Sequence, residues 1–156
     1  MEAARVATSH DIERIVALTH DLREELQPMK GGELWSEREA RPEPLDAAYR
    51  ELIDRDDALV VVGTIDHAVI GYGIVILEAL RNGTTLGIVT DLFVEPEARG
   101  CSVGETMKDL LVDFCDERGC IGIDALALPG HRAAKNFFET AGFTARAIVM
   151  HRRSPA

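Results

Sequence analysis

A chain of 156 residues suits a single domain with one sizeable core, and its hydrophobic and charged fractions of 46% and 28% are typical of a globular rather than a disordered protein. The formal net charge of −10 argues against a nucleic-acid partner, because an acidic surface repels a phosphate backbone. No apolar run is near the roughly 20 residues that span a bilayer, and three cysteines without CxxC spacing predict neither a disulfide framework nor a zinc site. We therefore expect a cytoplasmic protein without a membrane partner.

The N-terminal part of the chain predicts a strand, two helices and a block of three strands. Residues 4–8 predict a short strand, and apolar residues then recur at helical spacing up to about Pro28. Residues 27–44 contain three prolines, two adjacent glycines and the only tryptophan, so they predict a long, partly irregular connection of the kind that is usually functional or disordered. A second helix is expected over 45–56. The strands follow at residues 58–65, 68–80 and 84–94, with turns at Asp66-His67 and Asn82-Gly83.

The remaining residues predict alternating elements: a helix from about Ser102 to Gly119, a strand over 121–128, a helix over 129–142 and a last strand over 143–152. The central strands are apolar on both faces, which is typical of a sheet covered by helices on each side. The expected fold is therefore α/β, a mixed sheet with helices on both faces in the order β-α-α-β-β-β-α-β-α-β. It is formed by one domain over residues 1–156.

One glycine-rich stretch separates the strand that ends at Val94 from the helix that begins near Ser102. It reads Arg99-Gly100-Cys101-Ser102-Val103-Gly104. Unpaired backbone N–H groups at the start of a helix form an anion site, and glycine lets an oxygen approach the backbone closely. The stretch matches neither the GxxxxGK[ST] nor the GxGxxG phosphate loop. On these residues alone it is either an anion site or a tight turn.

Together with a second motif, this stretch resembles the GNAT superfamily of acyl-CoA-dependent N-acetyltransferases. The first motif of that family has the form [Q/R]-x-x-G-x-[G/A] and follows a strand that here ends in Leu-Phe-Val. The second has the form A-x-x-x-[Y/F]-x-x-x-G-F and is represented by Ala134, Phe138, Gly142 and Phe143. The resemblance extends over about residues 4–152, including the order of the elements, and implies acetyl-CoA (coenzyme A) as the cofactor.

The resemblance implies a cofactor-binding role for residues in three places. The backbone N–H groups of the glycine-rich stretch would hold the pyrophosphate of coenzyme A; these belong to Arg99, Gly100, Cys101, Ser102, Val103, Gly104 and Glu105. The backbone of Phe93 and Val94 would pair with the pantetheine amides like a short extra strand. A bulge would open the cleft by splaying this strand away from the strand over 121–128. His131 and Lys135 would contact the cofactor's tail or 3′-phosphate; alternatively, Lys135 is a surface charge and His131 a polar residue at the helix start.

The chain departs from the family pattern at three positions. Ser102 stands where glycine is usual, which is tolerated if its φ is negative but strained by about 1–2 kcal/mol in the left-handed region. Phe138 stands where many members have the tyrosine that protonates the leaving thiolate, and the alternative for Phe138 is a core residue. The glutamate that often serves as general base is absent, and the only carboxylate on the strand ending at Val94 is Asp91.

Asp91 and Tyr72 are therefore the catalytic side-chain candidates. By alternation, Asp91 shares a face with Val89 and Phe93. An aspartate in an otherwise apolar strand is either a base or ammonium anchor near the cleft, or the buried partner of a backbone group or an arginine. Tyr72 is either a core residue or a substitute hydroxyl near the acceptor. The spacing of the histidines predicts no metal site.

These features predict an N-acetyltransferase in which an amine attacks acetyl-CoA directly in a ternary complex, with the Val94 N–H stabilising the thioester oxyanion. The acceptor is expected to be a small cationic amine or a protein amine that enters beside residues 27–44. Candidate acceptor contacts there are Trp35 as an apolar wall and the acidic residues Glu33, Glu37 and Glu39. The alternative function is a catalytically weak acyl-CoA-binding regulatory module. A homodimer through an apolar C-terminal strand, Ala147–Met150, is compatible with the sequence.

Overall fold

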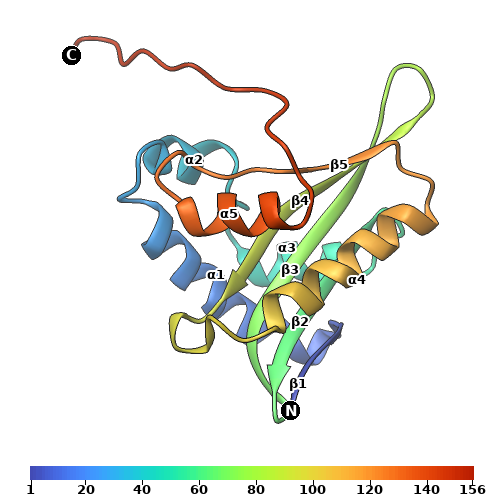
Figure 1. Cartoon of the computed structure of the whole chain (residues 1–156). Coiled ribbons are helices and arrows are strands. Elements are labelled where there is room, and N and C mark those ends of the chain that lie inside the picture. Colours follow the sequence, from blue (N-terminus) through green and yellow to red (C-terminus); the bar gives the residue numbers. More distant parts are fainter.

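The computed structural model describes residues 1–156 and contains one five-stranded sheet (Figure 1). The strands are β1 (Glu2–Val6), β2 (Ala58–Ile65), β3 (Ala68–Ala79), β4 (Thr85–Val94) and β5 (Gly122–Ala125). They lie in chain order across the sheet; β1 to β4 are antiparallel to their neighbours, and β5 is parallel to β4. The predicted turn between β2 and β3 is confirmed, because Asp66 and His67 have φ of 48° and 72°, the left-handed conformation that a tight hairpin turn requires.

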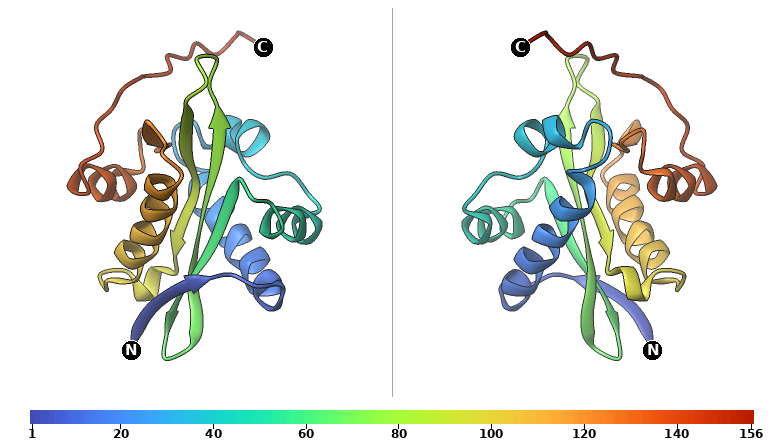
Figure 2. Two further views of the ribbon diagram at one scale, coloured as in Figure 1. Left: turned by 90° about the vertical axis from the view of Figure 1, so that its right-hand side faces the viewer. Right: turned by 90° about the vertical axis from the view of Figure 1, so that its left-hand side faces the viewer.

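Five helices cover the two faces of this sheet. They are α1 (Ile12–Leu26), α2 (Gly32–Arg38), α3 (Leu45–Ile53), α4 (Val103–Glu117) and α5 (Arg132–Thr140). Figure 2 shows α1, α2 and α3 on one side of the sheet and α4 and α5 on the other. The mixed sheet with helices on both faces is therefore confirmed. None of the helices combines the length and apolarity needed to cross a bilayer.

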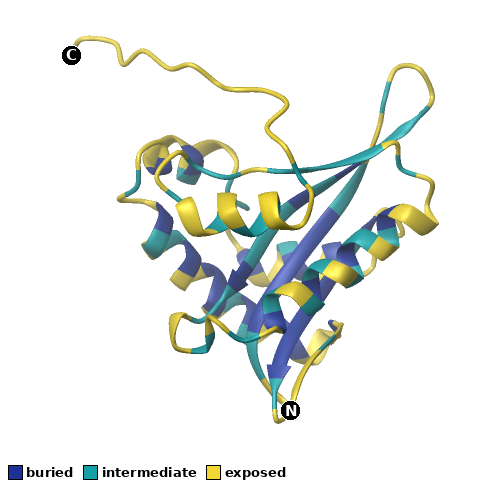
Figure 3. Ribbon diagram, viewed as in Figure 1, coloured by how far each residue is buried: buried dark blue, intermediate teal, exposed yellow.

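Each face of the sheet has its own apolar core. The larger core lies between the sheet and helices α1 and α3 and includes the fully buried Ile15, Leu18, Tyr49, Tyr72 and Ile74. The second lies beneath α4, which buries a residue on each successive turn: Val103, Met107, Leu111 and Cys115. Figure 3 shows the central strands as the most buried part of the molecule. The second core fixes the start of α4 against the sheet, because Val103 at that start is completely buried.

The C-terminal part of the chain differs from the prediction. Residues 143–152, expected to be a last strand, form no strand, and β5 is shorter than the predicted 121–128. Their side chains are largely exposed, including Ile148, Val149 and Met150. The segment has the composition of a strand, but a strand forms only where another strand offers backbone partners, and this segment leaves the sheet instead. Residues 27–44 also contain the short helix α2, which was not predicted.

A bulge in β4 changes which residues share a face of the sheet. Ile74 pairs with Asp91 and Val75 with Val89, so Thr90 is an extra residue in β4. The extra residue reverses the alternation of side chains. Val89 belongs to the core beneath α4, whereas Phe93 belongs to the core on the α1 side. The prediction that Asp91 shares a face with both of them was therefore wrong for Val89.

Candidate active site

The edge of β4 is open beyond the bulge. The parallel pairing of β4 with β5 ends at Val89 and Ala125, so β4 has no strand on that side from Thr90 to Val94. The Val94 carbonyl accepts a hydrogen bond from Arg99 Nε at 2.9 Å rather than from a strand. Because the N–H and C=O of one strand residue point to the same side, the Val94 N–H also faces this open edge. The predicted bulge and the splaying of β4 from β5 are both confirmed.

The glycine-rich stretch lies at the end of this open edge. Residues Pro96–Ala98 form a short 3₁₀ turn, Gly100 has a left-handed φ of 94°, and α4 begins at Val103. Ser102 has φ of −84°, so the serine that replaces the usual glycine is unstrained. The Cys101 thiol donates to the Ala98 carbonyl at 2.7 Å. The left-handed residue of the turn is thus Gly100, where a side chain would be unfavourable.

The backbone N–H groups of this stretch are mostly unpaired. The Ser102 N–H donates to Glu2 Oε2 at 3.0 Å, and the Ser102 hydroxyl contacts the same oxygen. The Arg99 N–H bonds to the Pro96 carbonyl at 3.3 Å. The N–H groups that donate no hydrogen bond within the chain are those of Gly100, Cys101, Val103, Gly104 and Glu105. Five donors therefore remain for a ligand at the positive end of α4.

The Glu2 carboxylate accepts hydrogen bonds from Ser102, which lies among these free N–H groups. Its hydrogen bonds to the Ser102 hydroxyl and N–H hold the pKa of the Glu2 carboxyl below its usual value. A side-chain oxyanion therefore already binds one N–H of the stretch, as a phosphate oxygen would. The residues present fit the pyrophosphate of coenzyme A on two grounds: several N–H groups of the stretch have no partner within the chain, and a carboxylate is already bound at the neighbouring Ser102 N–H. Glu2 lies 100 residues from Ser102 in the chain, so sequence spacing offered no signal for this contact.

Arg99 and His131 meet at a common carboxylate on α1. Arg99 Nη2 donates to Glu25 Oε1 at 2.7 Å, and His131 Nε2 lies 3.6 Å from Glu25 Oε2. The Arg99 guanidinium also lies over the Phe93 ring, 5.3 Å from its centre. Burial lowers the pKa of His131 below its ordinary value, more than the Glu25 carboxylate raises it. Glu25 was not predicted from the sequence, because its spacing marks it only as a residue of α1.

Lys135 is placed differently from His131. Its ammonium pairs with Glu139 at 3.0 Å, one turn along α5, and both side chains are exposed. This contact agrees with the alternative prediction, in which Lys135 is a surface charge. A role for Lys135 at the cofactor stays a prediction.

Asp91 is the centre of a buried polar network on the other side of the sheet from α4. Tyr72 Oη donates to Asp91 Oδ2 at 2.7 Å, and Arg41 Nη2 lies 3.3 Å from Asp91 Oδ1. Arg41 Nη2 also donates to the Thr90 hydroxyl at 3.0 Å. The Asp91 and Arg41 side chains are 10% and 17% exposed. The arginine partner that was one of the alternatives for Asp91 is therefore present, and the carboxylate still has lone pairs for a further donor.

Two further hydroxyls extend this network. The Tyr49 ring packs edge-on against Tyr72 with centroids 6.3 Å apart, and its hydroxyl contacts the Thr19 hydroxyl. Burial and the nearby Asp91 charge raise the pKa of Tyr49 to about 12 and that of Tyr72 well above its ordinary value. Both phenols therefore remain neutral donors at physiological pH. Of these residues, only Tyr72 was predicted from the sequence. Arg41 and Tyr49 carry no such signal, because Tyr49 is indistinguishable from an ordinary buried position of α3.

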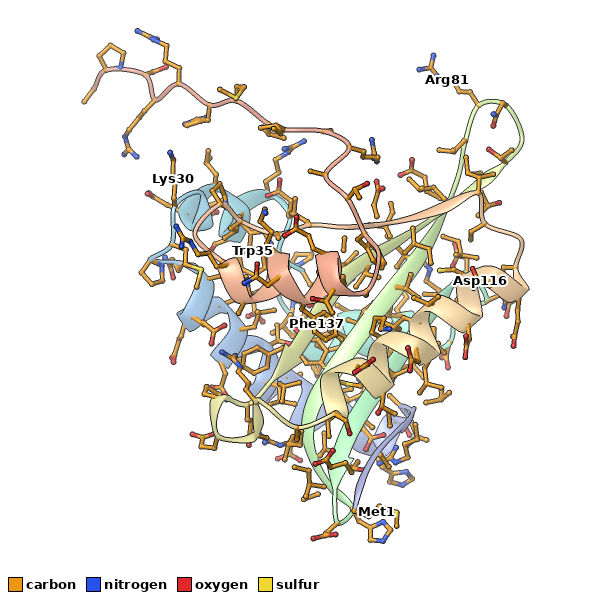
Figure 4. The ribbon with its side chains drawn as sticks, viewed as in Figure 1. Met1, Lys30, Trp35, Arg81, Asp116 and Phe137 are labelled. Carbon is orange, nitrogen blue, oxygen red and sulfur yellow. The ribbon has the colours of Figure 1, made fainter.

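The predicted acceptor contacts are not gathered around this network. Trp35 on α2 is buried in the larger core (Figure 4). Glu33 is 77% exposed and its only ion pair is with Arg153, at 3.9 Å. Glu39 pairs with the neighbouring Arg38 at 3.1 Å. No hydrogen bond or ion pair joins these residues to Asp91, so their roles stay predictions.

Phe138 lies in an aromatic cluster. Its ring centre is 5.3 Å from that of Phe137 and 5.2 Å from that of Phe143. A Cβ on Gly104 would lie 3.6 Å from the Phe137 ring, so α5 approaches the start of α4 (Figure 4). Phe138 therefore packs against other apolar side chains, as the alternative prediction of a core residue proposed.

Comparison with solved structures places the chain beside several acetyltransferases. The glucosamine-6-phosphate N-acetyltransferase of Arabidopsis thaliana is 20% identical, with a TM-score of 0.72 and 98% of each chain covered. AAC(6′)-Iy in complex with a bisubstrate analogue, CoA-S-monomethyl-acetylneamine, is 17% identical, with a TM-score of 0.75 and coverage of 100% of this chain and 99% of that one. A tetramutant of the BH1408 protein of Bacillus halodurans is 16% identical, with a TM-score of 0.82 and coverage of 97% and 99%. At these identities the similarity shows a shared fold.

The family assignment comes from the sequence itself. No curated protein matches the chain. Residues 8–143, however, match the acetyltransferase (GNAT) family, and this match includes β4, the glycine-rich stretch, α4 and α5. Most of the chain is covered, and the fold agrees with that of the acetyltransferase structures. The chain is therefore a member of the GNAT family of acetyltransferases.

Proposed function

We propose that this protein is an N-acetyltransferase that moves an acetyl group from acetyl-CoA to an amine by direct attack in a ternary complex. The observation that carries the proposal is the row of unpaired N–H groups at the start of α4, beside an edge of β4 that has no strand partner. The first feature suits a diphosphate and the second suits the amides of an extended arm. Three free cysteines fit a reducing cytoplasm, where we place the protein.

The residues of the open edge would bind and orient the cofactor. The N–H groups from Gly100 to Glu105 would hold the pyrophosphate, and the Val94 backbone would pair with the pantetheine. Arg99 must leave the Val94 carbonyl, which it caps in this structure, for that pairing to form. Acetyl-CoA supplies an acetyl thioester. The thiol formed from it has a pKa of about 8.5, so it can leave as the thiolate without a protonating side chain. Phe138 in place of tyrosine is compatible with such a reaction.

The buried network would serve the acceptor amine. An ammonium group must lose a proton before it can attack, and the free lone pairs of Asp91 can accept that proton through a water molecule. Arg41 and Tyr72 hold the carboxylate in one orientation through its two oxygens. The Val94 N–H, which faces the open edge, would donate to the developing oxyanion. We propose a small cationic amine or a protein amine as the acceptor, because Asp91 contributes the negative charge next to the open edge of β4.

A second function is favoured by two contacts. Phe138 packs in an aromatic cluster and offers no hydroxyl, and Asp91 already has a cationic partner in Arg41. An acyl-CoA-binding regulatory module would need neither residue for chemistry. The two functions differ in whether free thiol is released.

The proposal is tested by binding and turnover together. Calorimetry should detect coenzyme A, and purified protein with acetyl-CoA and a panel of polyamines, aminoglycosides, amino acids and peptides should release thiol. Gly104→Asp places a negative charge among the free N–H groups and should weaken coenzyme A binding at least about tenfold. Gly122→Asp makes the same change at the start of β5, where a Cβ would lie 3.9 Å from its nearest neighbour; it is the control and should bind normally. Tight binding without thiol release would favour the module, and equal binding by both variants would refute the proposed cofactor site.

A further inference from the structure

Arg41 uses only part of its hydrogen-bonding capacity within the fold. Its Nη2 donates to the Thr90 hydroxyl at 3.0 Å and to Asp91 Oδ1 at 3.3 Å. The Nε is buried and has no hydrogen-bond partner. The guanidinium is held over the Tyr49 ring, 5.8 Å from its centre, so its orientation is fixed while part of its donor set remains unused.

The same deficiency recurs in Arg23, on α1. Its Nη1 donates to Glu43 Oε1 at 2.9 Å, its Nη2 contacts the carbonyl of Arg41, and its Nε is buried without a partner. These two Nε atoms are the only buried side-chain nitrogen or oxygen atoms of the protein that lack a hydrogen-bond partner. A buried donor without an acceptor is unfavourable and marks a place where a ligand or water supplies the missing oxygen.

Both arginines lie on the acceptor side of the proposed active site. Thr90 and Asp91, which Arg41 contacts, are the first residues of β4 beyond its pairing with β5. Helix α1 and the segment between α2 and α3 that carries Arg41 lie on the face of the sheet opposite α4 (Figure 2). A ligand that reaches the Arg41 guanidinium therefore stands next to the carboxylate that would receive the proton of the acceptor amine.

The charges of this network are balanced, because Arg41 pairs with Asp91 and Arg23 with Glu43. An acceptor with only an ammonium group would compete with Arg41 for Asp91 and leave a mostly buried guanidinium without a counter-ion, which is costly. An acceptor that also carries a carboxylate avoids this cost. Its ammonium contacts Asp91 while its carboxylate receives the unused donors of Arg41, and the planar guanidinium matches the planar carboxylate.

We propose that the acceptor is an amino acid whose ammonium binds Asp91 and whose carboxylate binds Arg41. This inference rests on the proposed acetyltransferase function and narrows its acceptor to amines with a carboxylate on the adjacent carbon. The amine nitrogen forms a bond to the acetyl carbon as the bond from that carbon to sulfur breaks. Of the two protons that the ammonium loses, one goes to the thiolate and one to solvent. Arg41 is thus a substrate-binding residue, and Arg23 positions the segment that carries it.

The test compares each standard amino acid with its carboxamide, which has nearly the same size but no negative charge. A carboxamide also resembles the N-terminus of a peptide. Thiol release from acetyl-CoA should give a kcat/KM at least about tenfold higher for the reactive amino acid than for its carboxamide. Calorimetry with and without coenzyme A should detect binding of that amino acid and much weaker binding of its carboxamide.

Two variants assign the preference to one side chain. Arg41→Lys keeps a positive charge beside Asp91 but removes the planar set of donors, so the preference should fall below about threefold, mainly through a higher KM for the amino acid. Arg38→Lys makes the same change on α2, where the side chain is exposed and pairs with Glu39, and should keep the full preference. Circular dichroism shows whether each variant is folded, and the natural chain alone already decides whether the preference exists.

Several results would overturn the inference. Equal kcat/KM for amino acids and carboxamides, or thiol release only with amines that lack a carboxylate, would refute it and leave the acetyltransferase function intact. A full preference in folded Arg41→Lys would place carboxylate recognition elsewhere. If no acceptor releases thiol, the acetyltransferase function fails; amino-acid binding that Arg41→Lys abolishes would then still support the carboxylate site, and absence of such binding would refute it too.

Discussion

Replacing Asp91 with asparagine keeps the size of the side chain but removes the charge that Arg41 and Tyr72 contact. The Tyr72 hydroxyl, 2.7 Å away, can still donate to the asparagine oxygen. The Arg41 guanidinium, at 3.3 Å and mostly buried, would face a neutral amide. A hydrogen bond to a charged group contributes about 1.5–3 kcal/mol. Because this one is long and Arg41 is partly exposed, we expect the free energy of unfolding to fall by about 1.5–2 kcal/mol.

For a domain of this length, such a loss lowers Tm by about 3–8 °C, which scanning calorimetry resolves. If Asp91 accepts the proton of the acceptor amine, kcat should fall by about 100-fold or more, while the Kd for coenzyme A stays unchanged. Asp57→Asn is a matched control: its carboxylate pairs with Arg55 at 2.8 and 3.0 Å, but the pair is solvent-exposed. The control should leave both Tm and kcat unchanged.

An Asp91→Asn variant with normal kcat would remove Asp91 from the chemistry, whatever its stability. A normal Tm would show that the contact with Arg41 contributes nothing to folding. A loss of coenzyme A binding would mean that the substitution disturbs the open edge of β4, and the kinetic argument would then fail.

Three other expectations follow from single contacts. Glu2→Gln should lower the Kd for coenzyme A by about two- to fivefold in calorimetry, because it removes a negative charge from the Ser102 N–H; weaker binding would contradict this. Gly63→Ala places a Cβ 2.3 Å from a side chain of α4, so urea unfolding should show a loss of about 1–3 kcal/mol, and an unchanged midpoint would mean that α4 has room to move. Arg5 holds the pKa of the Asp11 carboxyl below its usual value. The stability that results is present above the ordinary pKa of about 3.9 and disappears as the pH falls through the lower folded-state pKa. The Tm difference between the natural chain and Asp11→Asn should therefore shrink on acidification, and a constant difference would contradict the linkage.

The elements that the sequence predicted well are those specified by neighbouring residues. Helices α1, α3 and α4 follow from apolar residues spaced three or four apart, and the turn at Asp66-His67 from its own two residues. The position of the glycine-rich stretch was also recognisable, because its residues are consecutive between β4 and α4. Even the tolerance of Ser102 depends only on its local φ.

Contacts between distant residues were beyond such reasoning. Arg41 reaches Asp91 across 50 positions, and Glu25 reaches Arg99 across 74. Neither arginine nor glutamate carries a local pattern that names its partner. The bulge at Thr90 also depends on a distant segment, because it is defined by the pairing of β4 with β3. This one extra residue places Val89 on the opposite face of the sheet from Asp91.

By itself, the amino-acid sequence determined the order of the elements through β5 and α5 apart from α2, the turn at Asp66-His67 and the position of the glycine-rich stretch, because periodicity and backbone preference act over a few residues. Only the tertiary structure decided which carboxylate meets which arginine, where β4 loses its partner, and that residues 143–152 join no strand of the sheet. A strand needs a neighbouring strand, and an ion pair needs an opposite charge. Each forms only when folding brings that partner within hydrogen-bond distance, and no local pattern contains that information.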